Sequence, residues 1–100
     1  MNRGDVYRYE PVINRPGVST LRLITSSNAI NDADGLPVVL TRHILDTDPG
    51  GLLAVETAYG WVSAMHPEAT IRRRLGERVG GLDRDTMERV ENALRAAEDL

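Results

Sequence analysis

The sequence predicts a mainly β domain of the α+β class, in which several short strands form a small half-open barrel that one C-terminal helix closes. Segments with strand-like patterns, separated by turn-forming residues, occupy residues 5–65, and one amphipathic helical segment ends the chain. One hundred residues can bury a core without a disulfide or a metal, so we expect a single domain over residues 1–100.

The expected strands alternate polar and apolar residues or form short apolar runs between turn-forming residues. They are Asp5–Pro11, Thr20–Thr25, Pro37–His43, Leu52–Thr57 and Trp61–Met65. The strand at Pro37–His43 is apolar on both faces over Val38–Leu40, which is typical of a central strand. The expected connections are a loop at Val12–Ser19, turns around a short helix within Ser26–Gly35, a loop at Asp46–Gly51 and a tight turn at Tyr59-Gly60.

The C-terminal segment has the clearest helical pattern. Asp83 is a good N-cap residue, and an apolar face follows at helical spacing. This face consists of Met87, Val90, Leu94 and Ala97. We expect this helix to pack on the sheet.

The segment before this helix has a weaker pattern. Ile71–Leu75 predicts a helical turn and Glu77–Val79 a short strand. The run Arg72-Arg73-Arg74 could contact phosphates, or it could form a solvated turn.

Composition limits which cellular compartment and which class of ligand we expect for this protein. The chain has no Cys, which excludes thiol catalysis and favours a reducing compartment. No apolar run is long enough to cross a bilayer, and polar residues begin at Asn2, so we expect a cytoplasmic protein. All twelve basic residues are Arg, which suits bidentate binding of phosphate, although a GC-rich genome would also explain the absence of Lys.

Six segments, in order along nearly the whole chain, resemble the MazF/PemK toxins, which share a fold with the gyrase poison CcdB. They are Arg3–Tyr7, Ile24–Asn31, Val38–Arg42, Gly60–Val62, Thr70–Leu75 and Leu82–Leu94. The resemblance implies a half-open SH3-like or CcdB-type β-barrel with a C-terminal helix, and a single MazF-like toxin domain over residues 1–100. It also implies a homodimeric toxin of a type II toxin–antitoxin system, with a cognate antitoxin and single-stranded RNA as partners.

Family members are mostly metal-independent endoribonucleases, so the resemblance implies cleavage of mRNA and growth inhibition without a cofactor. The RNA 2′-hydroxyl is the nucleophile in such a reaction. The protein must therefore supply a proton acceptor, a proton donor and a positive group near the phosphate. Two His residues and no Cys do not predict a zinc site.

The resemblance places catalytic residues on two neighbouring strands. Thr41 matches an active-site hydroxyl, although a β-branched residue is also common in any strand. The family's key Arg matches Thr20, which carries no charge. Arg22 lies two residues further on the same face, and Arg15 precedes a Pro as the family's Arg does. We favour Arg22 as the catalytic substitute and expect Arg15 and Thr20 to bind RNA.

The family's acidic and basic residues after Gly60 have no counterpart in Ser63–His66. His43 and His66 could replace them, because neutral imidazole titrates near working pH. We favour His43 as catalytic, since it shares a face with Thr41, and expect Arg42 and Ser63 to bind RNA. The aromatic residues are expected to pack rather than to stack on bases; they are Tyr7, Tyr9, Tyr59 and Trp61.

Two alternatives remain open at this point. One is a CcdB-like gyrase poison that cuts nothing, although such chains end in an apolar aromatic segment and this one ends in Ala96–Leu100. The other is a degenerate member that keeps antitoxin binding without catalysis. Thr20 at the Arg position and the lack of an acid in Ser63–His66 favour this second alternative.

Overall fold

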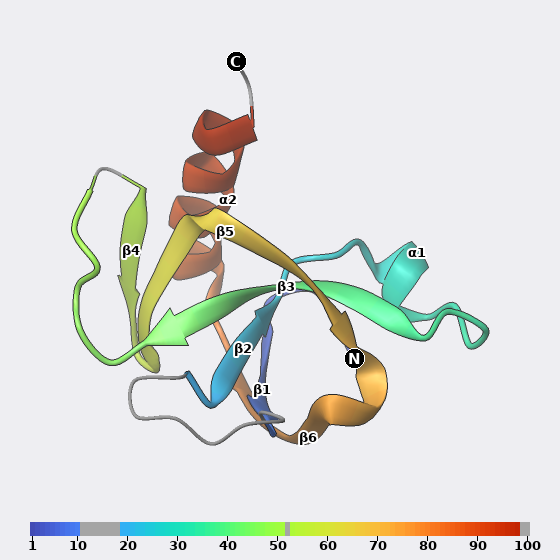
Figure 1. Ribbon diagram of the computed structural model, residues 1–100. Coiled ribbons are helices and arrows are strands. Elements are labelled where there is room, and N and C mark those ends of the chain that lie inside the picture. The colour runs from blue at the N-terminus through green and yellow to red at the C-terminus, as the bar shows by residue number, and fades with distance from the viewer. Residues whose placement is uncertain (11–18, 52, 99–100) are drawn as a thin grey trace.

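The computed structural model describes residues 1–10, 19–51 and 53–98 (Figure 1). These residues form a six-stranded antiparallel sheet in the order β4-β5-β3-β2-β1-β6. The elements are β1 (Asp5–Tyr9), β2 (Leu21–Ile24), α1 (Asn28–Asn31), β3 (Val38–Leu45), β4 (Ala54–Thr57), β5 (Gly60–Ile71), the single 3-10 turn η1 (Arg72–Arg74), β6 (Leu75–Gly81) and α2 (Arg84–Glu98). The curved sheet has β4 and β6 as its edges, which confirms the predicted half-open barrel with a C-terminal helix.

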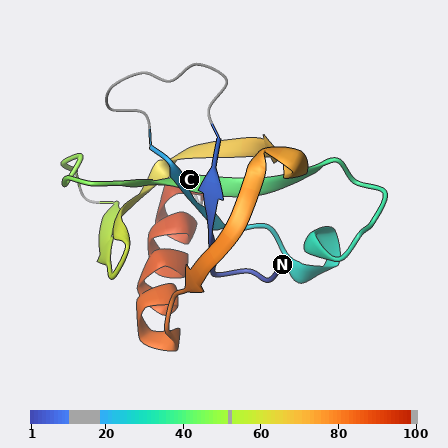
Figure 2. The same cartoon turned by 90° about the horizontal axis from the view of Figure 1, so that it is seen from below.

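The core lies between one face of the sheet and α2, which packs against β4 and β5. Figure 2 shows α2 on one side of the curved sheet. The predicted apolar face of α2 is confirmed, because Val90 and Leu94 are buried and Met87 and Ala97 pack against them. The sheet contributes Val6, Leu23, Ile44, Val62 and Ala64. The Thr86 amide donates to Asp83 Oδ1 at 2.7 Å, so Asp83 caps the helix as predicted.

β3 is the central strand of the sheet, as predicted, because it pairs with β2 on one side and β5 on the other. It continues to Leu45, whereas the prediction ended it at His43. Thr41 therefore lies in the middle of the strand rather than at its end, and its side chain is buried. The ladder bonds to both neighbours are the reason that the strand continues past the polar residues.

β5 is longer than the predicted strand at Trp61–Met65, and it is sharply bent (Figure 1). Its register with β3 shifts, because Val62 pairs with Ile44 whereas Pro67 pairs with Arg42. Residues 63–66 of β5 therefore lie opposite a single residue of β3, His43. Such a bulge bends a strand and accommodates a Pro without breaking the sheet.

The turn between β4 and β5 requires a glycine at position 60. Gly60 has φ +131°, and a Cβ there would lie 2.5 Å from the carbonyl oxygen of Leu45. This confirms the tight turn predicted at Tyr59-Gly60. The predicted loop at Val12–Ser19 lies outside the described residues, apart from Ser19. Among the described residues, no helix is long and apolar enough to span a membrane.

Candidate active site

Strand alternation brings polar side chains together on the face of the sheet opposite α2. Arg22 and His43 are register partners on β2 and β3, and Thr41 and Glu68 are partners on β3 and β5. Directly paired residues point to the same face. Leu23, the neighbour of Arg22, lies in the core beneath α2, so these four side chains lie on the other face.

Arg22 is a buried guanidinium, with 2% of its surface exposed. Its group lies over the Tyr9 ring, 3.9 Å from the ring centre, and its Nη1 donates to the Ser19 carbonyl at 2.9 Å. Among the described residues, its Nε has no hydrogen-bond partner, and the nearest carboxylate oxygen is Glu68 Oε1 at 3.9 Å. Burial lowers the pKa of Arg22, and the charge of Glu68 and the phenol of Tyr9 oppose that shift. Arg has so high an ordinary pKa that this side chain stays charged.

Glu68 connects the two halves of this polar cluster. One oxygen, Oε2, pairs with Nε2 of His43, and both side chains are about one-third exposed. The other oxygen, Oε1, accepts from the Thr70 hydroxyl at 3.5 Å. The hydroxyl oxygens of Thr70 and Thr41 are 2.8 Å apart. A chain of polar contacts therefore leads from the fully buried Thr41 to the partly exposed imidazole.

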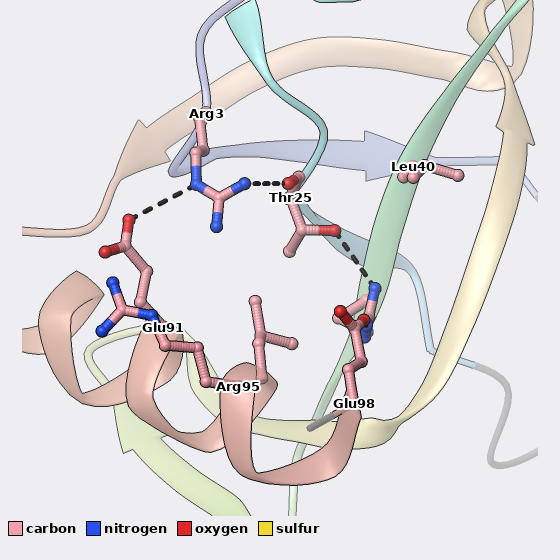
Figure 3. A pocket seen from close by; sticks show the side chains of 8 residues that line it. Arg3, Thr25, Leu40, Glu91, Arg95 and Glu98 are labelled. Atoms are coloured by element: carbon pink, nitrogen blue, oxygen red, sulfur yellow. Dashed lines mark hydrogen bonds and ion pairs between the residues drawn. The ribbon is translucent and has the colours of Figure 1, made fainter. Parts of the chain in front are cut away.

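Arg42 points to the opposite face from its neighbours Thr41 and His43. It is 3% exposed, its Nη2 donates to Glu98 Oε1 at 3.0 Å, and its Nη1 donates to Thr25 Oγ1 at 3.3 Å. It lines a cavity of about 440 Å³ between the sheet and α2. Figure 3 shows Arg3 and Leu40 on one side of this cavity and residues of α2 on the other. The structure thus does not bring Arg42 together with the other predicted site residues.

The remaining predicted RNA-binding residues lie apart from the cluster or outside the described parts. Thr20 is exposed and lines a cavity of about 340 Å³ beside Tyr9. Ser63 pairs with Ala54 of β4, at the far side of the bulge in β5. Arg15 and the side chain of His66 lie outside what the structure describes.

Glu68 was missed by the sequence analysis, because the expected strand ended at Met65. The region Ser63–His66 does lack an acid, but β5 continues and supplies one. A single residue, Ala69, separates Glu68 from Thr70 along the strand, so polar alternation past Pro67 was the available signal. Tyr9, expected to pack, covers the guanidinium of Arg22.

The cluster combines an imidazole, a carboxylate and a guanidinium. An imidazole can accept and return a proton, and a buried guanidinium supplies a positive potential to an anionic ligand. Within the described residues, no group of three His, Cys, Asp or Glu side chains could hold a metal ion. The arrangement therefore suits acid–base chemistry on an anionic substrate.

No protein-family model matches the sequence, and a search of curated proteins finds no match. Solved structures do match. A mycobacterial endoribonuclease in complex with its cognate antitoxin is 26% identical, with a TM-score of 0.84 over 100% of this chain and 96% of that chain. An endoribonuclease from a mycobacterial species is 26% identical, with a TM-score of 0.81 over 100% of this chain and 92% of that chain.

The Mycobacterium tuberculosis toxin MazF-mt6 is 18% identical, with a TM-score of 0.73 over 96% of this chain and 97% of that chain. At this low identity, the match shows only that the two chains share a fold. The resemblance seen in the sequence is therefore confirmed at the level of the fold, because the chain shares its fold with the MazF toxin and with the two mycobacterial endoribonucleases.

Proposed function

We propose that this protein is the toxin of a toxin–antitoxin pair and a metal-independent endoribonuclease that cuts single-stranded RNA, mRNA in particular. The observation that carries the proposal is the match of the whole chain, at a TM-score of 0.84, to an endoribonuclease bound to its cognate antitoxin. The polar cluster on the face opposite α2 supports it, because an imidazole and a guanidinium occur there together.

The chemistry needs no nucleophile from the protein. The 2′-oxygen of the RNA attacks the adjacent phosphorus, and the bond from phosphorus to the 5′-oxygen breaks. The products are a 2′,3′-cyclic phosphate and a 5′-hydroxyl. His43 accepts the proton of the 2′-hydroxyl, and the resulting imidazolium gives a proton to the departing 5′-oxygen. His43 suits both roles because its ring is partly exposed.

Arg22 and Thr41 act from beneath the surface in this proposal. Arg22 is too buried to bind a phosphate directly. It instead contributes a positive charge in a region of low dielectric. Thr41 is fully buried and reaches the imidazole through Thr70 and Glu68. Thr20 beside Tyr9 contacts the RNA chain, and Arg15, Arg42 and Ser63 stay predictions for RNA binding.

The proposal includes two protein partners. A cognate antitoxin blocks the site with an acidic or amphipathic segment, and a second copy of the chain completes a homodimer. Residues 1–100 act as a single toxin domain. The protein works in the cytoplasm, because its mRNA substrate is found there, and cleavage of that mRNA inhibits growth.

The test is incubation of the purified protein with a long single-stranded RNA in EDTA, with fragment ends read by primer extension. We expect discrete cuts at a shared short sequence. His43→Asn should abolish them, whereas Arg95→Ala, at an exposed position of α2 on the other face of the sheet from the polar cluster, should not. Failure of the folded protein to cut any RNA would overturn the proposal. A DNA gyrase supercoiling assay would then distinguish a gyrase poison from a non-catalytic antitoxin binder.

A further inference from the structure

Glu68 uses its two carboxylate oxygens for different partners. Oε2 pairs with Nε2 of His43. Oε1 accepts from Thr70 and lies 3.9 Å from Nε of Arg22. The carboxylate thus lies between a proton-transferring ring and a fixed positive charge. Its contacts with β2, β3 and β5 restrict its position on the surface of the sheet.

We propose that Glu68 is the positioning residue of this site, which holds the His43 ring through its Nε2–H and presents Nδ1 to the RNA 2′-hydroxyl. This inference rests on the proposed function. An ionised carboxylate only accepts hydrogen bonds, so a neutral imidazole bonded to it must carry its proton on Nε2. The lone pair of Nδ1 is then the one available for the substrate.

The carboxylate also lies between the imidazole and the buried positive charge of Arg22. Two charged groups face the imidazole, Glu68 from β5 and Arg22 from β2, and the titratable phenol of Tyr9 lies beyond Arg22. Glu68 carries the negative charge that lies between the imidazole and the guanidinium, so it offsets the positive charge of Arg22 at the ring. Removal of the charge of Glu68 therefore leaves the imidazole next to an unopposed guanidinium.

Thr70 and Thr41 support this arrangement from the buried side. If Thr70 donates to Glu68 Oε1, its oxygen is free to accept from the Thr41 hydroxyl, 2.8 Å away. Each hydroxyl then donates one hydrogen bond, and this series of hydrogen bonds ends at the carboxylate of Glu68. This direction of donation is consistent with an ionised Glu68, which needs donors on both oxygens.

The first measurement is RNA cleavage by Glu68→Gln, which keeps the side chain's size and removes its charge. We expect kcat to fall by about 10- to 100-fold, a typical cost of losing a residue that orients a reactive His, with KM changed far less. Glu68→Asp, which keeps the negative charge, should recover part of the activity. Glu88→Gln, an exposed Glu on α2, is the matched control and should match the wild type.

The second measurement does not depend on activity. The chain has two His residues, so His66→Gln leaves His43 as the sole imidazole for ¹⁵N NMR. At a pH where the ring is neutral, we expect the Nε2–H tautomer, and Glu68→Ala should give a mixture of tautomers.

The two measurements separate the two proposals. An Nδ1–H tautomer in the parent protein, or spectra unchanged by Glu68→Ala, would overturn the role of Glu68 even if the RNA is cut. A kcat unchanged by Glu68→Gln would also overturn it. An Nε2–H tautomer that depends on Glu68, in a folded protein that cuts no RNA, would instead overturn the proposed function.

Discussion

Thr41 and Thr70 join the central strand to β5 through their side chains, with hydroxyl oxygens 2.8 Å apart in a fully buried contact. A hydroxyl near the end of a strand would add little to stability, and the predicted strand ended at His43, two residues after Thr41. In the middle of β3 it is instead part of the buried polar cluster. Its replacement therefore affects stability as well as the site.

Thr41→Val and Thr70→Val should each destabilise the protein by about 1–2 kcal/mol, because each leaves a buried hydroxyl without its partner. The double variant should cost less than the sum of the two, since both polar groups are then gone. Urea unfolding monitored by circular dichroism would measure these values, with the exposed Thr47→Val as control. Strictly additive losses would show that the two hydroxyls are not coupled.

Arg22→Lys should lower kcat/KM for RNA cleavage by about 10- to 100-fold. Lys cannot reproduce both the planar stack on Tyr9 and the donation to the Ser19 carbonyl, so its charge would lie elsewhere. Arg95→Lys, on an exposed position of α2, should leave the rate unchanged. Rates would be measured at a temperature at which both variants are folded. Equal effects of the two substitutions would mean that the phosphate site has been misplaced.

Arg72 ties the segment around α1 to the end of β5, which makes it a structural residue. Its guanidinium donates to the carbonyls of Ile30, Asn31 and Leu36 at 2.6, 2.9 and 2.7 Å. Arg72→Met keeps the aliphatic stem and should cost about 1.5–3 kcal/mol, because hydrogen bonds from a charged donor are lost. Urea unfolding would measure the loss. The exposed neighbour Arg73→Met is the matched control, and an equal loss in both variants would contradict the assignment.

Asp83 should make α2 sensitive to acid. Hydrogen bonds from the Thr86 amide and hydroxyl hold the pKa of Asp83 below its ordinary value of 3.8. Its contribution to stability is therefore complete above the unfolded-state pKa and is lost as the pH falls through the lower folded-state pKa.

Asp83→Asn keeps a good N-cap residue but cannot titrate. The thermal midpoint of the parent protein should therefore fall more steeply than that of the variant below about pH 4. Thermal unfolding followed between pH 6 and pH 3 would measure both curves. Parallel curves over this interval would show that Asp83 does not contribute to the acid sensitivity.

Most strands and the C-terminal helix α2 could be predicted from the sequence, because these elements depend on local patterns. The apolar face that includes Val90 and Leu94, with Asp83 as its cap, needs no knowledge of the rest of the chain. β5 was predicted too short, because Pro67 resembles the end of a strand when read alone. Only pairing with β3 shows that the strand bulges there and continues to Ile71.

The α+β class, the central position of β3 and the shared face of Thr41 and His43 can be read from the sequence alone, since these follow from residue type and the two-residue period of a strand. The same period separates Arg42 from its neighbours, although the three residues are adjacent in the chain. The contact of Glu68 with Arg22 and His43, in contrast, becomes visible only in the folded chain. That contact depends on the register of three strands and on a bulge, which arise from long-range backbone pairing rather than from local sequence.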